Sequence, residues 1–145
     1  MEVCFFVPGP PQGKARARTV YNRRAGYTQS FTPQKTVLYE NWIKSMYWKE
    51  SQRVMWGEAE PLAVRITAVY EPPKSTGKRA RDRMLDGKFL PTKKPDADNI
   101  AKVVLDALNG VAYRDDSQVA RLTVEKEYGE EAGLRVRISE IDTGK

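Results

Sequence analysis

The chain has 145 residues, of which 40% are hydrophobic and 30% charged, and its formal net charge is +6 at pH 7. We expect one domain over residues 1–145, because this length suffices for a single core. One cysteine and no histidine exclude an internal disulfide, a four-thiolate zinc site and histidine catalysis. No apolar run is long enough for a bilayer and the start lacks signal-peptide features, so we expect a cytoplasmic protein with no membrane partner. We also expect no small organic cofactor.

The first part of the chain predicts a strand, a basic loop and a helix. Residues 2–7 are mostly apolar and are followed by a Pro-Gly cluster that would end a strand. Residues 12–31 hold five basic residues, no acidic residue and three aromatic ones, which suits a phosphate backbone but also fits a solvated loop. A helix from Thr32-Pro33 to about residue 56 would bury a stripe at helical spacing. The stripe comprises Val37, Leu38, Trp42, Ile43, Met46 and Tyr47.

The middle of the chain predicts a strand and a second basic loop. Residues 62–70 alternate with the period of two that a covered strand has. Residues 72–94 are rich in Lys and Arg without apolar periodicity, so we expect a long or partly disordered loop that orders on DNA. The residues expected to bind DNA are Lys14, Arg16, Arg18, Arg23 and Arg24 in the first basic loop, and Lys74, Lys78, Arg79, Arg81, Lys93 and Lys94 in the second.

The last third predicts a helix and a hairpin. The helix starts near Asp98 and ends at Asn109-Gly110, two residues that tolerate a left-handed conformation. Its buried stripe would be Ile100, Val103, Val104, Ala107 and Leu108. Strands over residues 120–128 and 134–138, joined by residues 129–133, read as a hairpin. The element order indicates an α+β fold with a small mixed or antiparallel sheet packed against two main helices.

Several aspartates near this helix have structural and catalytic readings. Asp98 could cap the helix, and Asp115 and Asp116 could accept backbone hydrogen bonds in a turn. Asp96 and Asp98 could instead point to one side and meet Asp116 across the short connection after residue 110. Three carboxylates inside a basic chain repel one another, and a hard divalent cation with oxygen ligands relieves this repulsion.

A Mg²⁺ ion at such a cluster would support phosphodiester hydrolysis without histidine, because it polarises the phosphate and activates a bound water. Mn²⁺ is expected to substitute. Lys102, one turn after Asp98, could neutralise charge developing on the phosphate, or it could pair with Asp98 or Asp106.

The motifs in this region resemble the RusA family of Holliday junction resolvases. The resemblance rests on Lys94-Pro95-Asp96-Ala97-Asp98-Asn99, on Lys102, on Asp106-Ala107-Leu108-Asn109-Gly110 and on Asp115-Asp116-Ser117-Gln118-Val119. It implies a homodimeric α+β nuclease of recombination and repair, often encoded by phages or prophages, that resolves four-way junctions by paired Mg²⁺-dependent cuts. By this resemblance Asp96, Asp98 and Asp116 are the catalytic metal-binding residues, Lys102 is the essential lysine, and Asp106 and Asp115 are supporting residues.

Two other functions fit the same residues. A Mg²⁺-dependent nuclease for flaps or replication forks would use the same active site. A non-catalytic nucleic-acid-binding module would use the aspartates only as caps and turn residues. The long 72–94 segment and the short turn before Asp115 depart from compact members of the family, and they leave the DNA-contacting loops undefined.

Overall fold

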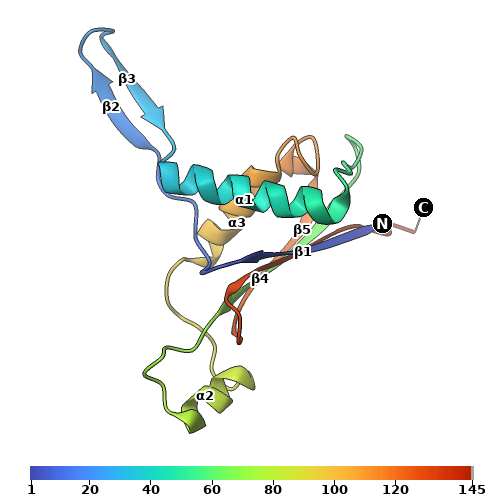
Figure 1. The fold of residues 1–145 in the computed structure, drawn as a ribbon. Coiled ribbons are helices and arrows are strands. Elements are labelled where there is room, and N and C mark those ends of the chain that lie inside the picture. Colours follow the sequence, from blue (N-terminus) through green and yellow to red (C-terminus); the bar gives the residue numbers. More distant parts are fainter. Residues whose placement is uncertain (145) are drawn as a thin grey trace.

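The computed structural model describes residues 1–144 and contains a four-stranded mixed sheet with two helices on one face (Figure 1). The sheet consists of β1 (Glu2–Pro8), β4 (Leu62–Tyr70), β5 (Val119–Tyr128) and β6 (Gly133–Glu140), in the order β1-β6-β4-β5. The two covering helices are α1 (Gln34–Ser51) and α3 (Ala97–Leu108). This arrangement confirms the predicted α+β fold with a small mixed sheet against two main helices.

Three further elements lie outside this layered body. A separate two-stranded ribbon is formed by β2 (Arg18–Asn22) and β3 (Tyr27–Phe31), and the short helix α2 (Lys78–Leu85) lies between β4 and α3. A 3-10 turn, η1 (Asp116–Gln118), precedes β5. In Figure 1 the ribbon and α2 project in opposite directions from the end of the molecule where α3 begins.

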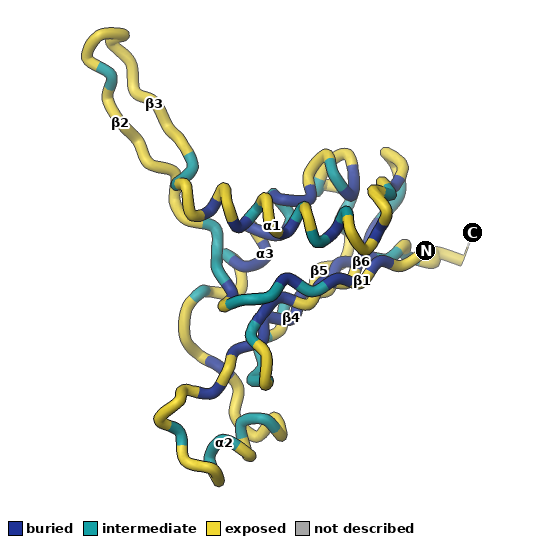
Figure 2. Tube along the Cα trace, viewed as in Figure 1, coloured by how far each residue is buried: buried dark blue, intermediate teal, exposed yellow. Residues whose placement is uncertain are grey.

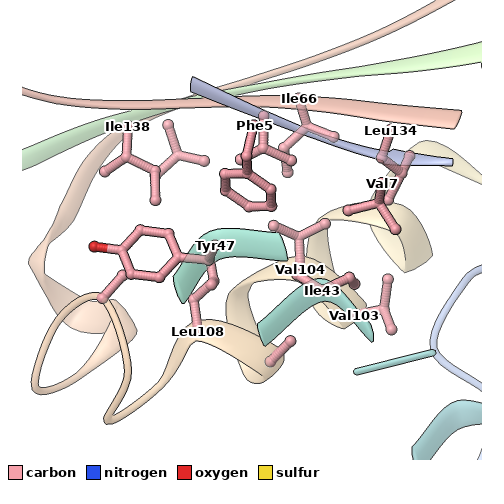
Figure 3. Close-up of a cluster of buried hydrophobic side chains, with 14 of the residues drawn as sticks. Phe5, Val7, Ile43, Tyr47, Ile66, Val103, Val104, Leu108, Leu134 and Ile138 are labelled. Atoms are coloured by element: carbon pink, nitrogen blue, oxygen red, sulfur yellow. The ribbon is translucent and has the colours of Figure 1, made fainter. Parts of the chain in front are cut away.

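The core lies between the sheet and the two helices. Val3, Phe5 and Val7 of β1 are buried, whereas Glu2 and Cys4 are exposed, as the alternation of a strand with one covered face requires. The ring of Phe5 stands edge-on to that of Tyr47 with 5.7 Å between the ring centres. Figure 3 shows side chains of α1 and α3 meeting those of the sheet. Burial of one such side chain contributes about 1.5–3 kcal/mol.

Helix α3 matches its prediction closely. Its buried residues include the predicted stripe Ile100, Val103, Val104, Ala107 and Leu108. Gly110 follows the helix with φ +72°, the left-handed conformation expected there, but Asn109 has φ −59° and is not left-handed. The parallel pairing of β4 with β5 requires a crossover connection, and α3 forms part of it.

Helix α1 buries only part of the predicted stripe. Val37, Leu38 and Trp42 are exposed, and the helix ends at Ser51 instead of continuing to about residue 56. The buried residues are Thr36, Tyr39, Ile43, Tyr47 and Ser51. They lie four residues apart or nearly so, and they include Ile43 and Tyr47 of the predicted stripe, whereas Tyr39 was not expected in the core. Pro33 precedes the helix, and no side chain caps its start.

The predicted loop over residues 12–31 is wrong in its second half, which forms the ribbon. β2 and β3 pair antiparallel from Arg18 opposite Phe31 to Asn22 opposite Tyr27. The side-chain oxygen of Asn22 accepts the backbone N–H groups of Arg24 and Ala25 at 3.0 and 3.1 Å, and Gly26 has φ +70°. These features close a turn between two runs of β-branched and aromatic residues.

The other basic segment and the predicted hairpin also differ from expectation. Residues 72–94 are not one continuous loop, because α2 occupies the centre of this stretch with half-buried apolar side chains on one side. The strands β5 and β6 do not pair with each other, since β4 lies between them, parallel to β5 and antiparallel to β6. The link over residues 129–133 therefore crosses the end of β4, where Gly129 donates its N–H to the carbonyl of Tyr70 at 2.9 Å.

None of the helices over residues 1–144 is both long and apolar enough to cross a membrane.

Candidate active site

The start of α3 presents two carboxyl groups. The helix begins directly after Asp96, whose backbone is extended and whose carbonyl accepts the N–H of Ile100 at 3.0 Å. The side chain of Asp96 makes no capping hydrogen bond, and Asp98 stands in the first turn. Within residues 1–144 the carboxyl group of Asp98 makes no hydrogen bond or ion pair, so the structure does not show the capping role. Helix geometry favours negative charge here, because the first N–H groups point toward it.

Asp116 is held by the end of α3 through Asn109. The backbone N–H of Asp116 donates to the side-chain oxygen of Asn109 at 2.9 Å. Tyr113, which lies between Asn109 and Asp116 in the sequence, is fully buried. Its hydroxyl donates a hydrogen bond to the carbonyl of Leu105 at 2.8 Å. Burial, together with the charges of Asp116 and Asp106, raises the pKa of Tyr113, so the hydroxyl remains a donor. The segment that carries Asp116 is thus fixed to α3 from two sides.

Gln118 fixes the other side of the same turn. Its amide oxygen accepts the N–H groups of Arg114 and Asp115 at 3.0 and 3.2 Å, and its amide nitrogen donates to two carbonyls of the connection before β4, at 2.8 and 3.1 Å. The carboxyl group of Asp115 accepts a hydrogen bond from the hydroxyl of Ser117. Asp115 therefore shapes the turn that presents Asp116, and the side chain itself is engaged within the turn.

Two adjoining grooves bring these acidic residues to one surface. The first, which we call the basic groove after Lys14, Arg16 and Lys102, is lined equally by the carboxyl groups of Asp96, Asp98 and Asp106. The apolar groove is lined by Asp98, Lys102, Leu105, Asp106, Asp116 and Leu122, among others. Asp98, Lys102 and Asp106 belong to both, so they stand on the border between the grooves. The structure therefore places Asp98, Lys102 and Asp116 along one groove, and Asp96 in the neighbouring one.

The convergence of all three predicted ligands on one ion is not seen in this arrangement. Within residues 1–144 no three acidic side chains lie close enough to form a ready metal-binding group. The donor set nevertheless fits Mg²⁺, which takes hard oxygen ligands and is commonly held by one or two carboxylates together with waters and substrate phosphates. Asp98 and Asp116, on the same groove, supply such a pair. The roles of Asp96, Asp98 and Asp116 as ligands stay a prediction.

Lys102 is exposed and has no ion-pair partner within residues 1–144. The alternative reading, a pair with Asp98 or Asp106, is therefore not what the structure shows. Lys102 lies at the border of the two grooves, where Asp98 lines both grooves and Asp116 lines the apolar one.

Asp106 instead pairs with Lys14, in a cluster that the sequence did not indicate. The ammonium group of Lys14 lies 3.3 Å from the carboxyl group of Asp106 and 3.2 Å from that of Glu40 on α1. Burial lowers the pKa of Lys14, but hydrogen bonding and charge from Glu40 and Asp106 outweigh it, so the pKa is raised overall. Lys14 therefore connects α1 with α3 through ion pairs that were not expected, and its contact with DNA stays a prediction.

The other predicted DNA-binding residues are spread over the basic groove, the ribbon, α2 and the segments on either side of α2. Arg16 lines the basic groove, and Arg18, Arg23 and Arg24 lie on the exposed ribbon. Lys74, Lys78 and Arg79 are exposed on or before α2, whereas Arg81 is half-buried. Lys94 is exposed, and Lys93 holds its ammonium group 5.5 Å from the centre of the Tyr70 ring. Their contact with DNA stays a prediction.

Asn109, Tyr113, Gln118 and Glu40 were not expected to serve the site. Asn109 was expected at the helix end and within the family-like motif, but not as the partner of Asp116, and its side-chain bond to Asp116 joins two segments whose approach the pattern of apolar residues does not specify. Gln118 stands three residues after Asp115, a spacing typical of a capping box, and this was the one sequence signal for its role. Glu40 offered no such signal.

Comparison with known proteins identifies the class of protein that this fold and site belong to. The model of the family described as endodeoxyribonuclease RusA matches residues 8–139, so the chain belongs to the RusA endodeoxyribonuclease family. It is accordingly an endodeoxyribonuclease, a hydrolase that cuts within DNA. The matched range includes the ribbon, α2 and every predicted site residue.

Among curated relatives, the chain is similar to the uncharacterized protein YqaN of Bacillus subtilis (strain 168). The two are 40% identical over 139 residues, which cover 96% of each chain. The likeness therefore extends over nearly the whole length of both proteins, and it includes the regions outside the central motifs.

Proposed function

We propose that this protein resolves four-way (Holliday) DNA junctions by paired, Mg²⁺-dependent phosphodiester hydrolysis. The observation that carries the proposal is the single groove shared by Asp98, Lys102 and Asp116, whose carboxyl and ammonium groups are not consumed by ion pairs within residues 1–144. Basic residues of the ribbon and of α2 flank this end of the molecule (Figure 1). Membership in the RusA family supports the same conclusion.

Each residue of the site has a role that follows from its position. Asp98 and Asp116, with Asp96 from the neighbouring groove, would hold the Mg²⁺ ion, which when bound polarises the phosphate and activates a water molecule. Lys102 places a positive charge beside the scissile phosphate, where it stabilises negative charge that develops during the reaction. Asn109 and Gln118 keep the Asp116 turn in place against α3. Mn²⁺ should replace Mg²⁺, because both accept the same oxygen ligands.

Paired cutting would follow from a homodimer with two-fold symmetry. Such a dimer presents two equal sites, so that two strands of like polarity can be cut at one junction. The basic side chains of the ribbon and α2 would hold phosphates of the duplex arms in each half.

The variant Asp98→Asn tests the catalytic role. It removes one negative charge while keeping the size of the side chain, so we expect cutting of junctions in Mg²⁺ to fall by about a thousandfold or more. Junction binding, measured by gel shift in Ca²⁺, should remain within about twofold of wild type. Asp142→Asn, at the exposed C-terminal tail, is the matched control and should cut normally. Normal cutting by Asp98→Asn would remove this residue from the mechanism.

The substrate is tested separately by comparing four-way junctions, flaps, forks and linear duplexes of equal length. We expect the four-way junction to be cut fastest, with symmetric paired products. Faster cutting of a flap or fork would replace junction resolution by flap or fork processing while leaving the assigned site intact. Binding without any cutting in Mg²⁺ or Mn²⁺ would favour a non-catalytic DNA-binding module.

A further inference from the structure

The ribbon formed by β2 and β3 has no core of its own. All of its strand residues except Asn22 are exposed, and Figure 2 shows this exposure along its whole length. Val20, Tyr21, Tyr27 and Phe31 are exposed by 47%, 61%, 52% and 48%. A two-stranded ribbon in water is at best marginally stable when nothing covers it. The exposed apolar side chains of the ribbon therefore indicate a surface that another molecule covers.

The charge of the ribbon selects the kind of partner. Arg16 leads into it, Arg18 lies on β2, and Arg23 and Arg24 form its tip, whereas residues 12–31 contain no acidic residue. Within residues 1–144 these four arginines make no ion pair. A second copy of the ribbon would bring the same charges into contact, but a polyanion would neutralise them.

The two faces of the ribbon differ in chemistry. The strand pairing places Arg18, Val20, Gln29, Phe31 and Tyr27 on one face, and Gln29 donates to the hydroxyl of Tyr27 at 3.0 Å. The opposite face carries Thr19, Tyr21, Thr28 and Ser30, all with hydroxyl groups. The first face combines a guanidinium, an amide and apolar side chains, the groups that contact base edges and thymine methyl groups.

We infer that the ribbon lies in the major groove of the duplex arm next to the scissile phosphate, with the Arg18–Phe31 face toward the bases. This inference rests on the proposed junction cutting. Strands of five residues reach about 17 Å, since each residue of an antiparallel strand adds about 3.4 Å. The major groove, about 12 Å wide, admits a two-stranded ribbon, whereas the minor groove of about 6 Å does not.

The root of the ribbon is fixed to the candidate active site. Lys14 donates its N–H to the carbonyl of Asn99 at 3.0 Å, and Ala15 donates to the hydroxyl of Thr36 at 3.3 Å. A Cβ on Gly13 would stand 2.8 Å from that of Asn99, so the chain packs directly on the first turn of α3. A duplex held by the ribbon is therefore held at a fixed position relative to Asp98.

The test compares binding of two junctions by two proteins. One junction carries glucosylated 5-hydroxymethylcytosine in the flanking duplex, which fills the major groove, and the other is unmodified. In the shortened protein Asn-Gly replaces residues 20–29, so that the paired residues Thr19 and Ser30 flank a two-residue turn. We expect wild type to bind the modified junction at least about tenfold more weakly, and the shortened protein to bind both junctions equally.

The inference fails if wild type binds both junctions equally, or if the shortened protein keeps the difference. It also fails if sedimentation shows that shortening turns a dimer into a monomer, because a second copy would then be the partner. If wild type neither binds nor cuts the unmodified junction, the proposed function fails instead.

Two charge variants of the full-length protein test the inference even if the shortened protein does not fold. Arg23→Ala with Arg24→Ala should lower the salt dependence of junction binding by about two phosphate contacts, a decrease of roughly 1.8 in the slope of log K against log salt. Lys49→Ala with Arg53→Ala, at the far end of α1, is the matched control. An unchanged slope for the ribbon variant would overturn the inference.

Discussion

Helix α3 and the β2–β3 ribbon carry many of the predicted site residues but are built in opposite ways. The helix buries six residues and holds its acidic side chains on a surface fixed by the core, whereas the ribbon buries none. The helix is therefore stabilised by its own chain, and the ribbon needs an external surface. This difference means that chemistry and DNA holding should be separable by mutation.

The largest expected effect on stability comes from a substitution in the core beneath α3. Ile100→Ala should lower the free energy of unfolding by about 2–5 kcal/mol, because it leaves a cavity under α3. Val20→Ala on the ribbon, where the side chain is 47% exposed, should change it by less than about 0.5 kcal/mol. Urea unfolding of both variants measures the difference. Equal losses would show that the ribbon packs on the body of the protein.

The same comparison explains which elements the sequence revealed. The stripe of α3 and the strand over residues 62–70 were predicted correctly, because local periodicity records the buried face of each element, although β4 is buried on both faces from Ile66 to Tyr70. The stripe on α1 was only partly correct, since Ile43 and Tyr47 are buried as predicted, but Val37, Leu38 and Trp42 are exposed and Tyr39 takes a core position. Apolar character alone does not decide which face of a helix a sheet will cover.

The ribbon and the order of the sheet were missed for different reasons. Residues 18–31 combine β-branched and aromatic side chains with an Asn and a Gly in the turn, but their positive charge favoured a loop in the sequence reading. The insertion of β4 between β5 and β6 is a pairing between distant segments. Adjacent strands with a short link suggested a hairpin, and no local pattern reports such an insertion.

Within the site, the sequence said more about residue types than about their partners. It drew attention to Asp98, Lys102 and Asp116, which line one groove, and their catalytic roles stay a prediction. It did not show that Asp106 pairs with Lys14, because that contact depends on how the chain before the ribbon packs on α3. The amide of Asn109 was likewise hidden, since its partner is a backbone group seven residues away.

The contact between the root of the ribbon and the start of α3 should be sensitive to a single added methyl group. In Gly13→Ala the new Cβ would stand 2.8 Å from the Cβ of Asn99 and 3.0 Å from that of Pro95, so one of these backbones must shift. We expect a loss of about 1–3 kcal/mol in the free energy of unfolding and weaker cutting. Gly57→Ala, which meets nothing within 4 Å, is the matched control and should do neither. Wild-type stability for Gly13→Ala would mean that the root of the ribbon is loosely held.

The placement of Asp116 offers a smaller effect that is specific to activity. Asn109→Ala removes the oxygen that accepts the Asp116 N–H at 2.9 Å, so the turn should become less well positioned. We expect cutting to fall by about tenfold, with a higher Mg²⁺ concentration needed for half-maximal rate. Titration of the rate with Mg²⁺ separates this result from simple destabilisation, which would lower the rate without moving the midpoint. An unmoved midpoint would contradict a positioning role.

The smallest expected effect concerns the pair that joins the two helices. Lys14→Met should lower the free energy of unfolding by about 1 kcal/mol, because it leaves the carboxyl group of Glu40, only 15% exposed, without its cation. The double variant Lys14→Met with Glu40→Gln should recover most of this loss, since the only carboxyl group then left without its cation is that of Asp106, which is 38% exposed to water. Recovery would be absent if Lys14 acted only through its contact with Asp106.

The contribution of Lys14 to the free energy of unfolding should change with pH in one definite direction. The pKa of Lys14 is raised above 10.5 in the folded protein, so folding favours the protonated form. Its contribution is therefore complete below the unfolded pKa and is lost as the pH rises through the folded value. Stability difference curves of wild type minus Lys14→Met should be flat in neutral solution and fall only in strongly alkaline solution. A difference that vanished near neutral pH would show that Lys14 is not charged where it lies, and would undo the link between α1 and α3 that holds the ribbon against the site.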